Sequence, residues 1–357
     1  YDPNSINDTS DDFRNITFSG FQKSKAKQEL LNCLYNGKIE NACYWGAEFI
    51  CSNHYLELWD IIILYYCKFI HCGNVKFPIY LSMRYNNFVT ILHNGYNTNT
   101  LPMRNNKKIR KLFAEIICIL CFSNKKHTYS EVKLNKSEEF DLTNISSKFK
   151  APNMHFLDNV FKDDDPKELL IPFNELIYNL VNKNIIDTCY WYEWIIEYEN
   201  ICKKKKKKCI CQARAYAPNG HHNDIIWIVW DAIFYYANPE NQSVINDNIS
   251  NTENANIVYK IIKALYELFI IRYNAPIKRK RKFIIYFCFS LLTENHNLNV
   301  QITNKNGEIV AITEKIDEIY KQIKKNEKNP GTDYLFNNLK KSNLEKTIEK
   351  IEMINNI

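Results

Sequence analysis

Residues that form tight turns are scarce in this chain. Its 357 residues include only 8 glycines and 10 prolines. Glycine and proline supply the backbone conformations of hairpins and phosphate-binding loops, so an all-β architecture and glycine-rich nucleotide loops are disfavoured. Hydrophobic residues make up 45% of the chain and charged residues 24%, as in folded globular proteins. The sequence therefore predicts an all-α protein.

Apolar residues recur at helical spacing in two groups of five segments. The first group covers about residues 23–35, 39–51, 55–70, 78–93 and 106–122. The second covers about residues 166–182, 185–201, 223–237, 255–272 and 279–292. Asp165-Pro166-Lys167-Glu168 opens the second group with a cap, a first-turn proline and a third-position acid, which predict a helix start.

The two groups correspond in order. Trp59-Asp60 matches Trp230-Asp231 at a shift of 171. A shift of 146 aligns two further pairs of segments, Glu29-Leu30-Leu31 with Glu175-Leu176-Ile177 and Cys43-Tyr44-Trp45 with Cys189-Tyr190-Trp191. Because the matches are collinear, we interpret the chain as a tandem duplication of a five-helix unit.

The breaks in the helical pattern predict the domain boundaries. They delimit a flexible tail (1–17), a first helical repeat (18–123), a linker (124–164), a second helical repeat (165–295) and a C-terminal appendage (296–357). The tail is polar, acidic and without a period. In the appendage, alternation around Asn306-Gly307 predicts a small β-hairpin. Two helices follow it, one carrying Ile316 and Ile319 and one opening at Ser342-Asn343-Leu344-Glu345.

Three basic clusters are the candidate functional features of a chain with a net charge of +7. One is a run of six lysines, which we expect to be extended or frayed because like charges repel. The other two stand at the predicted start of the fifth helix in each repeat, where positive charge opposes the helix dipole and an anionic ligand would compensate it. The predicted nucleic-acid-binding residues are Lys203, Lys204, Lys205, Lys206, Lys207, Lys208, Lys278, Arg279, Lys280, Arg281, Lys282, Arg104, Lys107, Lys108, Arg110 and Lys111.

Alternative interpretations of these clusters stay open. The lysine run is also typical of a solvated insertion loop. The basic helix starts are also explained by nearby acids, such as Asp163-Asp164-Asp165.

The 12 cysteines are scattered through apolar helical patterns, where a reduced thiol packs as a small hydrophobic group. This distribution predicts a reducing intracellular compartment. Zinc is an alternative to the expected absence of any cofactor, with candidate ligands Cys202, Cys209, Cys211, His221 and His222. Those five residues lack paired Cys-x-x-Cys knuckles, and the lysine run among them would oppose a cation.

The aromatic sets favour a role in the core over base stacking, because they lie beside isoleucine and leucine at helical spacing and recur in both repeats. They are Tyr44, Trp45, Trp59, Tyr190, Trp191, Trp194, Trp227 and Trp230. Asp60 and Asp231, each directly after a tryptophan, are expected to bind helix ends or basic side chains. One carboxylate per repeat makes no acid–base pair.

Familiar catalytic and nucleotide-binding motifs are absent from the sequence, which predicts a non-enzymatic protein. No transmembrane segment is expected either. The longest apolar stretch, Trp59 to Ile70, contains Asp60 and Lys68 and is too short to cross a bilayer.

Several segments resemble an uncharacterised helical protein family of the nucleocytoplasmic large DNA viruses, the giant viruses. They are Phe18-Ser19-Gly20-Phe21, Ala42-Cys43-Tyr44-Trp45 with Glu48, Leu58-Trp59-Asp60, Arg104-Asn105-Asn106, Glu139-Phe140-Asp141-Leu142, Asp165-Pro166-Lys167-Glu168-Leu169 and Cys189-Tyr190-Trp191. The resemblance would cover residues 18–295. It implies a viral source and a location in the host cytoplasm, the viral factory or the virion, and it implies no activity.

The function predicted from these observations is a non-enzymatic adaptor or scaffold that binds nucleic acid through its basic clusters. Other proteins of the same complex are the second expected class of partner. The alternatives are a structural or assembly protein of a virus particle, whose basic loops meet acidic protein surfaces, and an unrecognised enzyme, with zinc as its candidate metal.

Overall fold

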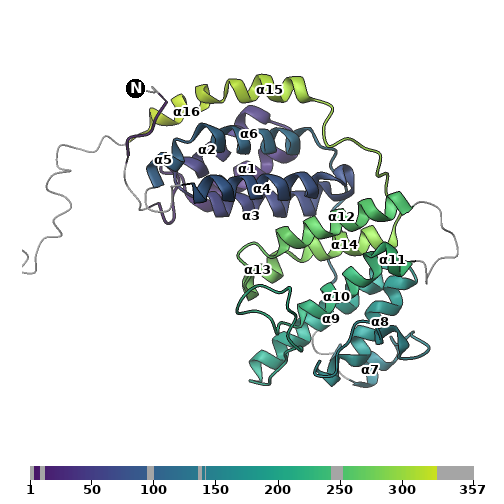
Figure 1. Ribbon diagram of the computed structural model, residues 1–357. Helices are drawn as coiled ribbons and strands as arrows, with labels where there is room; N and C mark the ends of the chain where they lie inside the picture. Colours follow the sequence, from purple (N-terminus) through teal and green to yellow (C-terminus); the bar gives the residue numbers. More distant parts are fainter. Residues whose placement is uncertain are drawn as a thin grey trace, which may run out of the picture.

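Apolar side chains at helical spacing fold into helices along the chain. The computed structural model describes residues 4–8, 13–94, 100–135, 139–140, 142–242 and 252–327. Within these ranges it contains α-helices and short 3₁₀ and π turns but no β-strand, which confirms the all-α prediction (Figure 1).

The first unit begins at Lys23 and follows the predicted segments closely. Its third segment is α-helical only to Tyr65 and then continues as a π turn and a 3₁₀ turn. The elements are α1 (Lys23–Tyr35), α2 (Ile39–Cys51), α3 (Tyr55–Tyr65), η1 (Tyr66–Ile70), η2 (His71–Asn74), α4 (Phe77–His93), α5 (Thr100–Arg104) and α6 (Lys107–Phe122).

The second unit contains the second group of predicted segments. Short turns precede it and flank its main helices. The elements are α7 (Leu142–Ser146), η3 (His155–Leu157), η4 (Lys167–Leu169), α8 (Leu170–Val181), α9 (Ile185–Lys204), α10 (Ile226–Ala237), α11 (Pro239–Gln242), α12 (Thr252–Phe269), α13 (Ala275–Lys280) and α14 (Lys282–Thr293).

The helix predicted to start at Asp165-Pro166 begins later, at Leu170. The Asp165 carboxylate does not cap it. That carboxylate instead receives two hydrogen bonds from the Arg214 guanidinium, the longer at 2.7 Å, and one from the backbone N–H of Gln212 at 2.9 Å. Because Asp165 is engaged in this buried ion pair, residues 167–169 form a 3₁₀ turn ahead of the α-helix.

The N-terminal tail is packed where it is described, so the prediction of a flexible tail is wrong for residues 4–8 and 13–17. Ile6 and Thr17 are buried. The Asn105 side chain pairs with the backbone of Ile6 through bonds of 2.8 and 2.9 Å. The isolated apolar side chains Ile6 and Phe13 anchor a segment that looks polar on average.

The segment predicted as a linker is largely a cover for the second unit. Ile145, Leu157 and Val160 are buried. The backbone N–H groups of Lys150 and Ala151 bind the Glu175 carboxylate of α8. Residues 142–164 therefore belong to the second unit rather than to a connection between units.

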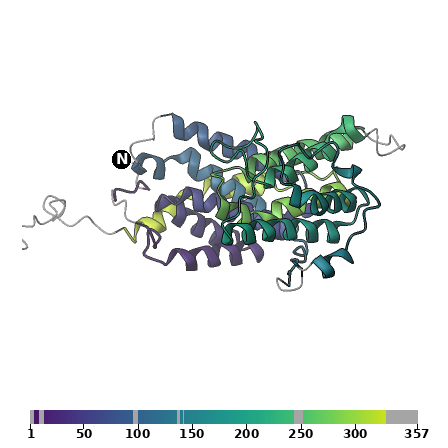
Figure 2. The ribbon, with the colours of Figure 1, turned by 90° about the horizontal axis from the view of Figure 1, so that it is seen from below.

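The C-terminal appendage contains no hairpin where one was predicted. Asn306-Gly307 instead begins α15 (Asn306–Glu314), and α16 (Ile316–Lys324) follows directly. A short alternating pattern fits an amphipathic helix as well as a hairpin, and here Ile309 is buried where α15 packs on α6. α16 packs on α2 and α6, and in both views it lies near the N-terminal end of the chain (Figures 1 and 2). The helix predicted after Ser342 lies outside the described residues.

The two units share helix order and packing. In each, the first main helix packs on the second, and the last packs on the first, the second and the fourth: α1, α2, α4 and α6 in one unit, α8, α9, α12 and α14 in the other.

The ends of α1 and α8 share their hydrogen bonds at the predicted shift of 146. Gly37 and Lys183 both have positive φ, 66° and 58°. The residue after each closes the helix, with Lys38 N–H bound to Cys33 O and Asn184 N–H bound to Asn179 O, both at 2.9 Å. This is the same C-terminal capping motif in both units.

The buried tryptophans after these helices also have equivalent surroundings. Trp59 contacts the rings of Tyr85 and Phe88 on α4, and Trp230 contacts those of Tyr266 and Phe269 on α12. Both tryptophans are fully buried.

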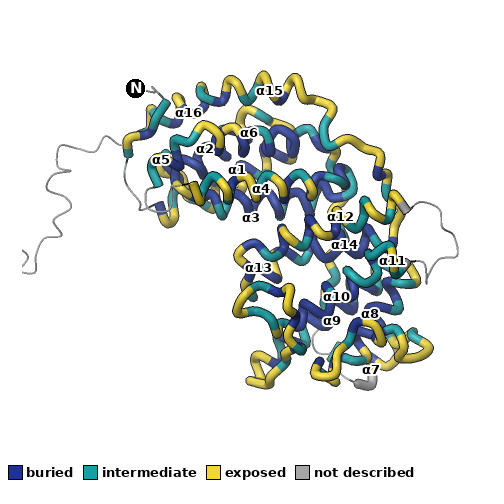
Figure 3. The backbone as a smooth tube through the Cα atoms, in the orientation of Figure 1, coloured by how far each residue is buried: buried dark blue, intermediate teal, exposed yellow. Residues whose placement is uncertain are grey.

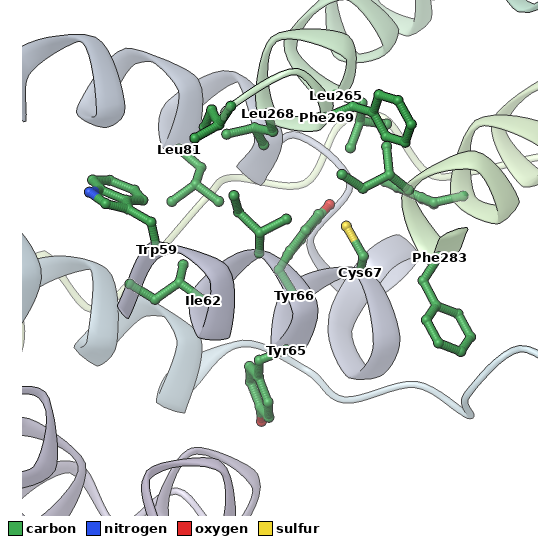
Figure 4. Close-up of a cluster of buried hydrophobic side chains, with 14 of the residues drawn as sticks. Trp59, Ile62, Tyr65, Tyr66, Cys67, Leu81, Leu265, Leu268, Phe269 and Phe283 are labelled. Carbon is green, nitrogen blue, oxygen red and sulfur yellow. The ribbon is translucent and has the colours of Figure 1, made fainter. Parts of the chain in front are cut away.

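The cores of the units merge where α4 packs against α12. Figure 4 shows Trp59, Tyr66 and Leu81 of the first unit facing Leu268 and Phe269 of the second. All five side chains are buried. The hydrophobic core is therefore continuous from one unit to the other.

Candidate nucleic-acid interface

The basic cluster of the first unit is partly interior. Arg104 and Arg110 are each 1% exposed. Arg104 donates to the backbone carbonyl of Asp8 at 2.9 Å, and Arg110 donates to that of Asn4 at 3.2 Å. The Arg110 guanidinium also lies 3.9 Å from the ring centroid of Tyr320 on α16. These two arginines hold the N-terminal segment and α16 on the first unit. Neither side chain is exposed for contact with a phosphate.

The start of α6 has a cap of its own. The Asn106 side chain accepts hydrogen bonds from the backbone N–H groups of Lys108 and Ile109, at 2.9 and 3.2 Å. The anion that we expected at this helix start is thus replaced by a neutral amide oxygen. Lys107, Lys108 and Lys111 remain on the surface.

The basic cluster of the second unit is divided between the end of one helix and the start of the next. Lys278, Arg279 and Lys280 form the last turn of α13, and α14 begins only at Lys282. Positive charge is favourable at a helix C-terminus, so the predicted conflict with the helix dipole does not arise for these three residues and is confined to Arg281 and Lys282 at the start of α14.

Lys278, Arg281 and Lys282 of this cluster have acidic partners inside the molecule. The Lys278 ammonium, 1% exposed, lies 2.7 Å from a carboxylate oxygen of Glu199 and 2.7 Å from one of Asp224. Arg281, also buried, pairs with Asp60 of the first unit at 2.7 Å. Partial burial lowers the pKa of Lys282, but Glu131 and Glu193 outweigh it and raise that pKa. These three cations stabilise the fold, and the prediction that they contact a phosphate is not supported by their positions.

The lysine run turns back sharply instead of extending. Lys203 and Lys204 complete α9. Lys206 has a left-handed φ of 54°, and the backbone N–H of Lys207 binds the carbonyl of Cys202 at 2.8 Å. This is a capping turn of the kind that closes α1 and α8. All six lysines are exposed at the tip of α9 (Figure 3).

Two of the three predicted clusters lie next to each other. Glu199 on α9 binds Lys203 through one carboxylate oxygen and Lys278 through the other, each at 2.7 Å. One residue later, Asn200 accepts a hydrogen bond from Arg279. We call the exposed basic side chains of these two neighbouring clusters, Lys203–Lys208, Arg279 and Lys280, the basic ridge.

The cations of the basic ridge differ from the interior ones in their pairing. Lys203 is paired with Glu199. Among the residues that the structure describes, Lys204–Lys208 and Lys280 have no acidic partner. Unlike the interior cations, these side chains can meet an external anion without breaking an internal bond.

Two of the five candidate zinc ligands, Cys211 and His222, contact backbone carbonyl groups. Within the described ranges, no group of three or more His, Cys, Asp and Glu side chains is placed to hold a metal ion. The Cys211 thiol donates to the Asp224 carbonyl at 3.1 Å, and His222 Nδ1 lies 3.1 Å from the Arg214 carbonyl. Burial, as the leading cause, raises the pKa of Cys209 to about 12, so its thiol is protonated at neutral pH.

Most of the aromatic side chains belong to the core, as predicted. Trp59, Trp191, Trp227 and Trp230 are fully buried, while Trp45 is only partly so. The two aspartates that follow tryptophans also behave as expected, since Asp60 pairs with Arg281 and Asp231 with Arg214, both at 2.7 Å.

Arg214 is the charged residue that sequence reasoning missed. Its side chain is completely buried between Asp165 and Asp231. Burial would lower the pKa of Arg214, but the two carboxylates outweigh it and raise that pKa. Arg214 lies in a segment without helical period. The one sequence signal of its burial is that it stands alone among apolar and small residues.

Among the described residues, none of the helices combines the length and the apolar character that crossing a bilayer requires. Comparisons of the chain with protein families, with curated proteins and with solved structures found no match.

Proposed function

We propose that this protein is a non-enzymatic helical scaffold that binds nucleic acid through the basic ridge. The observation that carries the proposal is the contrast between exposed, unneutralised lysines at the tip of α9 and interior cations paired with acids elsewhere. A row of ammonium groups on one surface attracts phosphates without reading sequence. The proposed site therefore contains Lys203–Lys208, Arg279 and Lys280 and omits Arg104, Arg110, Lys278 and Arg281.

The capping turn supports a defined binding surface. A lysine in the left-handed conformation at position 206 is strained, and the turn folds the following lysines back toward the end of α9 instead of letting them extend away. Lysines held together cost less entropy to order on a phosphate backbone than lysines in an extended coil.

We also propose that the two units arose by duplication of one ancestral unit. The shared capping bonds at Gly37 and Lys183 and the matching surroundings of Trp59 and Trp230 support this. The basic ridge has no counterpart in the first unit, where α2 ends at Cys51 without a lysine run. Under this proposal the second unit acquired nucleic-acid binding after the duplication.

Binding to mixed-sequence DNA and RNA, measured by fluorescence anisotropy at several salt concentrations, tests the function. We expect a steep loss of affinity with salt. Replacing Lys204–Lys208 by glutamine should reduce the slope of log K against log salt by roughly 3 or more, since each phosphate contact contributes about 0.7–0.9.

A matched control removes five exposed lysines elsewhere, at positions 25, 162, 315, 321 and 325. It changes the net charge equally and should leave most of the slope in place. Absence of binding at low salt, or an equal loss of slope in both variants, would refute the proposal and favour a scaffold that contacts proteins only.

A further inference from the structure

A groove runs between the two units, separate from the tip of α9. It has a volume of about 430 Å³ and lies where α1 and α3 of the first unit meet α13 and α14 of the second. Its apolar lining is contributed by both units and includes Ile61, Leu64, Cys67, Ile277, Phe283 and Ile284. A groove of this size, lined mainly by hydrophobic side chains, suits a small organic ligand.

The groove is accessible at its rim. Ser24, Lys27 and Lys280 are exposed, whereas Ile61, Cys67 and Ile284 are buried beneath. Cys67 and Phe283 lie on neighbouring elements in Figure 4, at the edge of the core that joins the units. An apolar ligand body would thus rest against side chains that the fold already holds in place.

The charges around the groove do not cancel. Lys23 pairs with Glu57 at 3.2 Å, and Arg281 pairs with Asp60 at 2.7 Å. Two cations on opposite walls then remain, Lys27 on α1 and Lys280 on α13, and neither has an acidic partner among the described residues. The rim therefore complements one anionic group.

We propose that this groove binds a small amphipathic anion, with an unbranched or compact apolar body and one carboxylate. The body would cover Ile61, Leu64, Ile277 and Phe283, and the carboxylate would lie between Lys27 and Lys280. The groove lies apart from the tip of α9 and shares only Lys280 with the basic ridge. Because both units contribute walls, an occupied groove would also stabilise their junction.

Calorimetric titration with decanoate below its micelle concentration tests the site. We expect decanoate to bind with one-to-one stoichiometry and at least tenfold more tightly than decanol. Hexanoate, which lacks four of the methylenes, should bind at least tenfold more weakly than decanoate. Decyltrimethylammonium should not compete.

Two sets of variants locate the ligand. Lys27→Gln with Lys280→Gln should weaken decanoate at least tenfold and leave decanol unchanged, whereas Lys162→Gln with Lys315→Gln, on elements that do not line the groove, should change neither. Leu64→Trp and Ile277→Trp fill the groove from opposite walls, and each should abolish binding of both probes, with circular dichroism confirming that the variant is folded.

Decanol binding as tightly as decanoate, or decanoate binding unchanged in folded Leu64→Trp and Ile277→Trp, would overturn the inference. Its failure is distinct from that of the proposed function. Replacing Lys204–Lys208 by glutamine should leave decanoate binding intact, and Lys27→Gln should leave the salt slope for nucleic acid intact.

Discussion

At the scale of single residues, several cations are buried and serve the fold instead of a partner. Arg104, Arg110, Arg214 and Lys278 are each 1% exposed. A charge taken out of water must be matched by acceptors within the protein, and each of these has carbonyl or carboxylate partners in place. These buried cations count toward the formal net charge of +7, but they are not available to an external partner.

Removing the Arg214 guanidinium should be costly. In Arg214→Met, Asp165 and Asp231 lose their common partner, and Asp165 is left as a buried, unpaired carboxylate. We expect the free energy of unfolding, measured by urea denaturation, to fall by about 3–5 kcal/mol.

The control is Lys204→Met, an exposed position where a change of less than about 0.5 kcal/mol is expected. Adding Asp165→Asn to Arg214→Met should recover part of the loss. A loss below about 1 kcal/mol in Arg214→Met would show that the ion pair is not formed.

The Asp224 carboxylate should make stability depend on acid. Burial would raise the pKa of Asp224, but the Lys278 ammonium and the hydrogen bonds from Lys278, Ile226 and Tyr273 outweigh it and lower that pKa. Because the folded-state pKa lies below the unfolded value of about 3.9, this pair stabilises the protein above about pH 4–5. Its contribution is lost as the pH falls through the folded-state pKa.

Urea denaturation at pH 7, 5, 4 and 3 measures this effect. Asp224→Asn should be less stable than the wild type at pH 7, and the difference should shrink as the pH falls below about 4. A difference that stays constant from pH 7 to pH 3 would argue against the pairing with Lys278.

Helix ends determine much of the arrangement at the scale of the elements. α1, α8 and α9 all close with a left-handed residue, but only α1 has a glycine there, Gly37. α8 and α9 use Lys183 and Lys206, which bear a Cβ atom in a conformation that disfavours one. In the first unit α2 closes in the same way with Asn53, at a φ of 61°.

Exchanging the residues at the equivalent helix ends should change stability in opposite directions. Lys183→Gly relieves the strain at an exposed side chain and should raise the free energy of unfolding by about 0.5–1 kcal/mol. Gly37→Ala should lower it by about 1 kcal/mol. The Cβ added at Gly37 would lie 3.8 Å from the Cys121 carbonyl oxygen, an ordinary contact, so this cost comes from the backbone.

Thermal and urea denaturation of both variants check this pair. Lys162→Gly, at an exposed position outside these turns, is the control and should not stabilise. A destabilised Lys183→Gly would show that φ at this residue is not positive.

At the scale of the whole molecule, the junction between the units couples their stability. α4 packs on α12, and Arg281 pairs with Asp60 across the junction. Neither unit buries this surface alone, because Leu81 and Leu268 belong to one shared core. The two units should therefore unfold together.

Leu268→Ala tests this cooperativity. Leu268 is fully buried at the junction, so the substitution should lower the free energy of unfolding by about 2–5 kcal/mol. Hydrogen exchange should accelerate by a similar factor in the slowest amides of α2 and of α9. Acceleration restricted to the second unit would mean that the units unfold separately.

The sequence alone was sufficient for the helices and for much of the core. Helical periodicity predicted α1 and α2 to the residue, since spacing of apolar side chains decides which face is buried. It failed at Asn306-Gly307, where a short alternating pattern suits a hairpin or a helix, and the packing of α15 on α6 decides between them. It also failed at Asp165, whose carboxylate accepts hydrogen bonds from the distant Arg214 instead of capping the helix that follows it.

Which cations face outward was decided only by tertiary structure. Lys278 and Lys280 are two residues apart in one basic cluster, yet one is buried against Glu199 and Asp224 and the other is exposed. The groove between the units likewise needs walls from residues more than 200 positions apart, such as Leu64 and Ile277. A linear pattern records which residues are charged or apolar, whereas their partners are set by contacts between elements that the chain brings together only on folding.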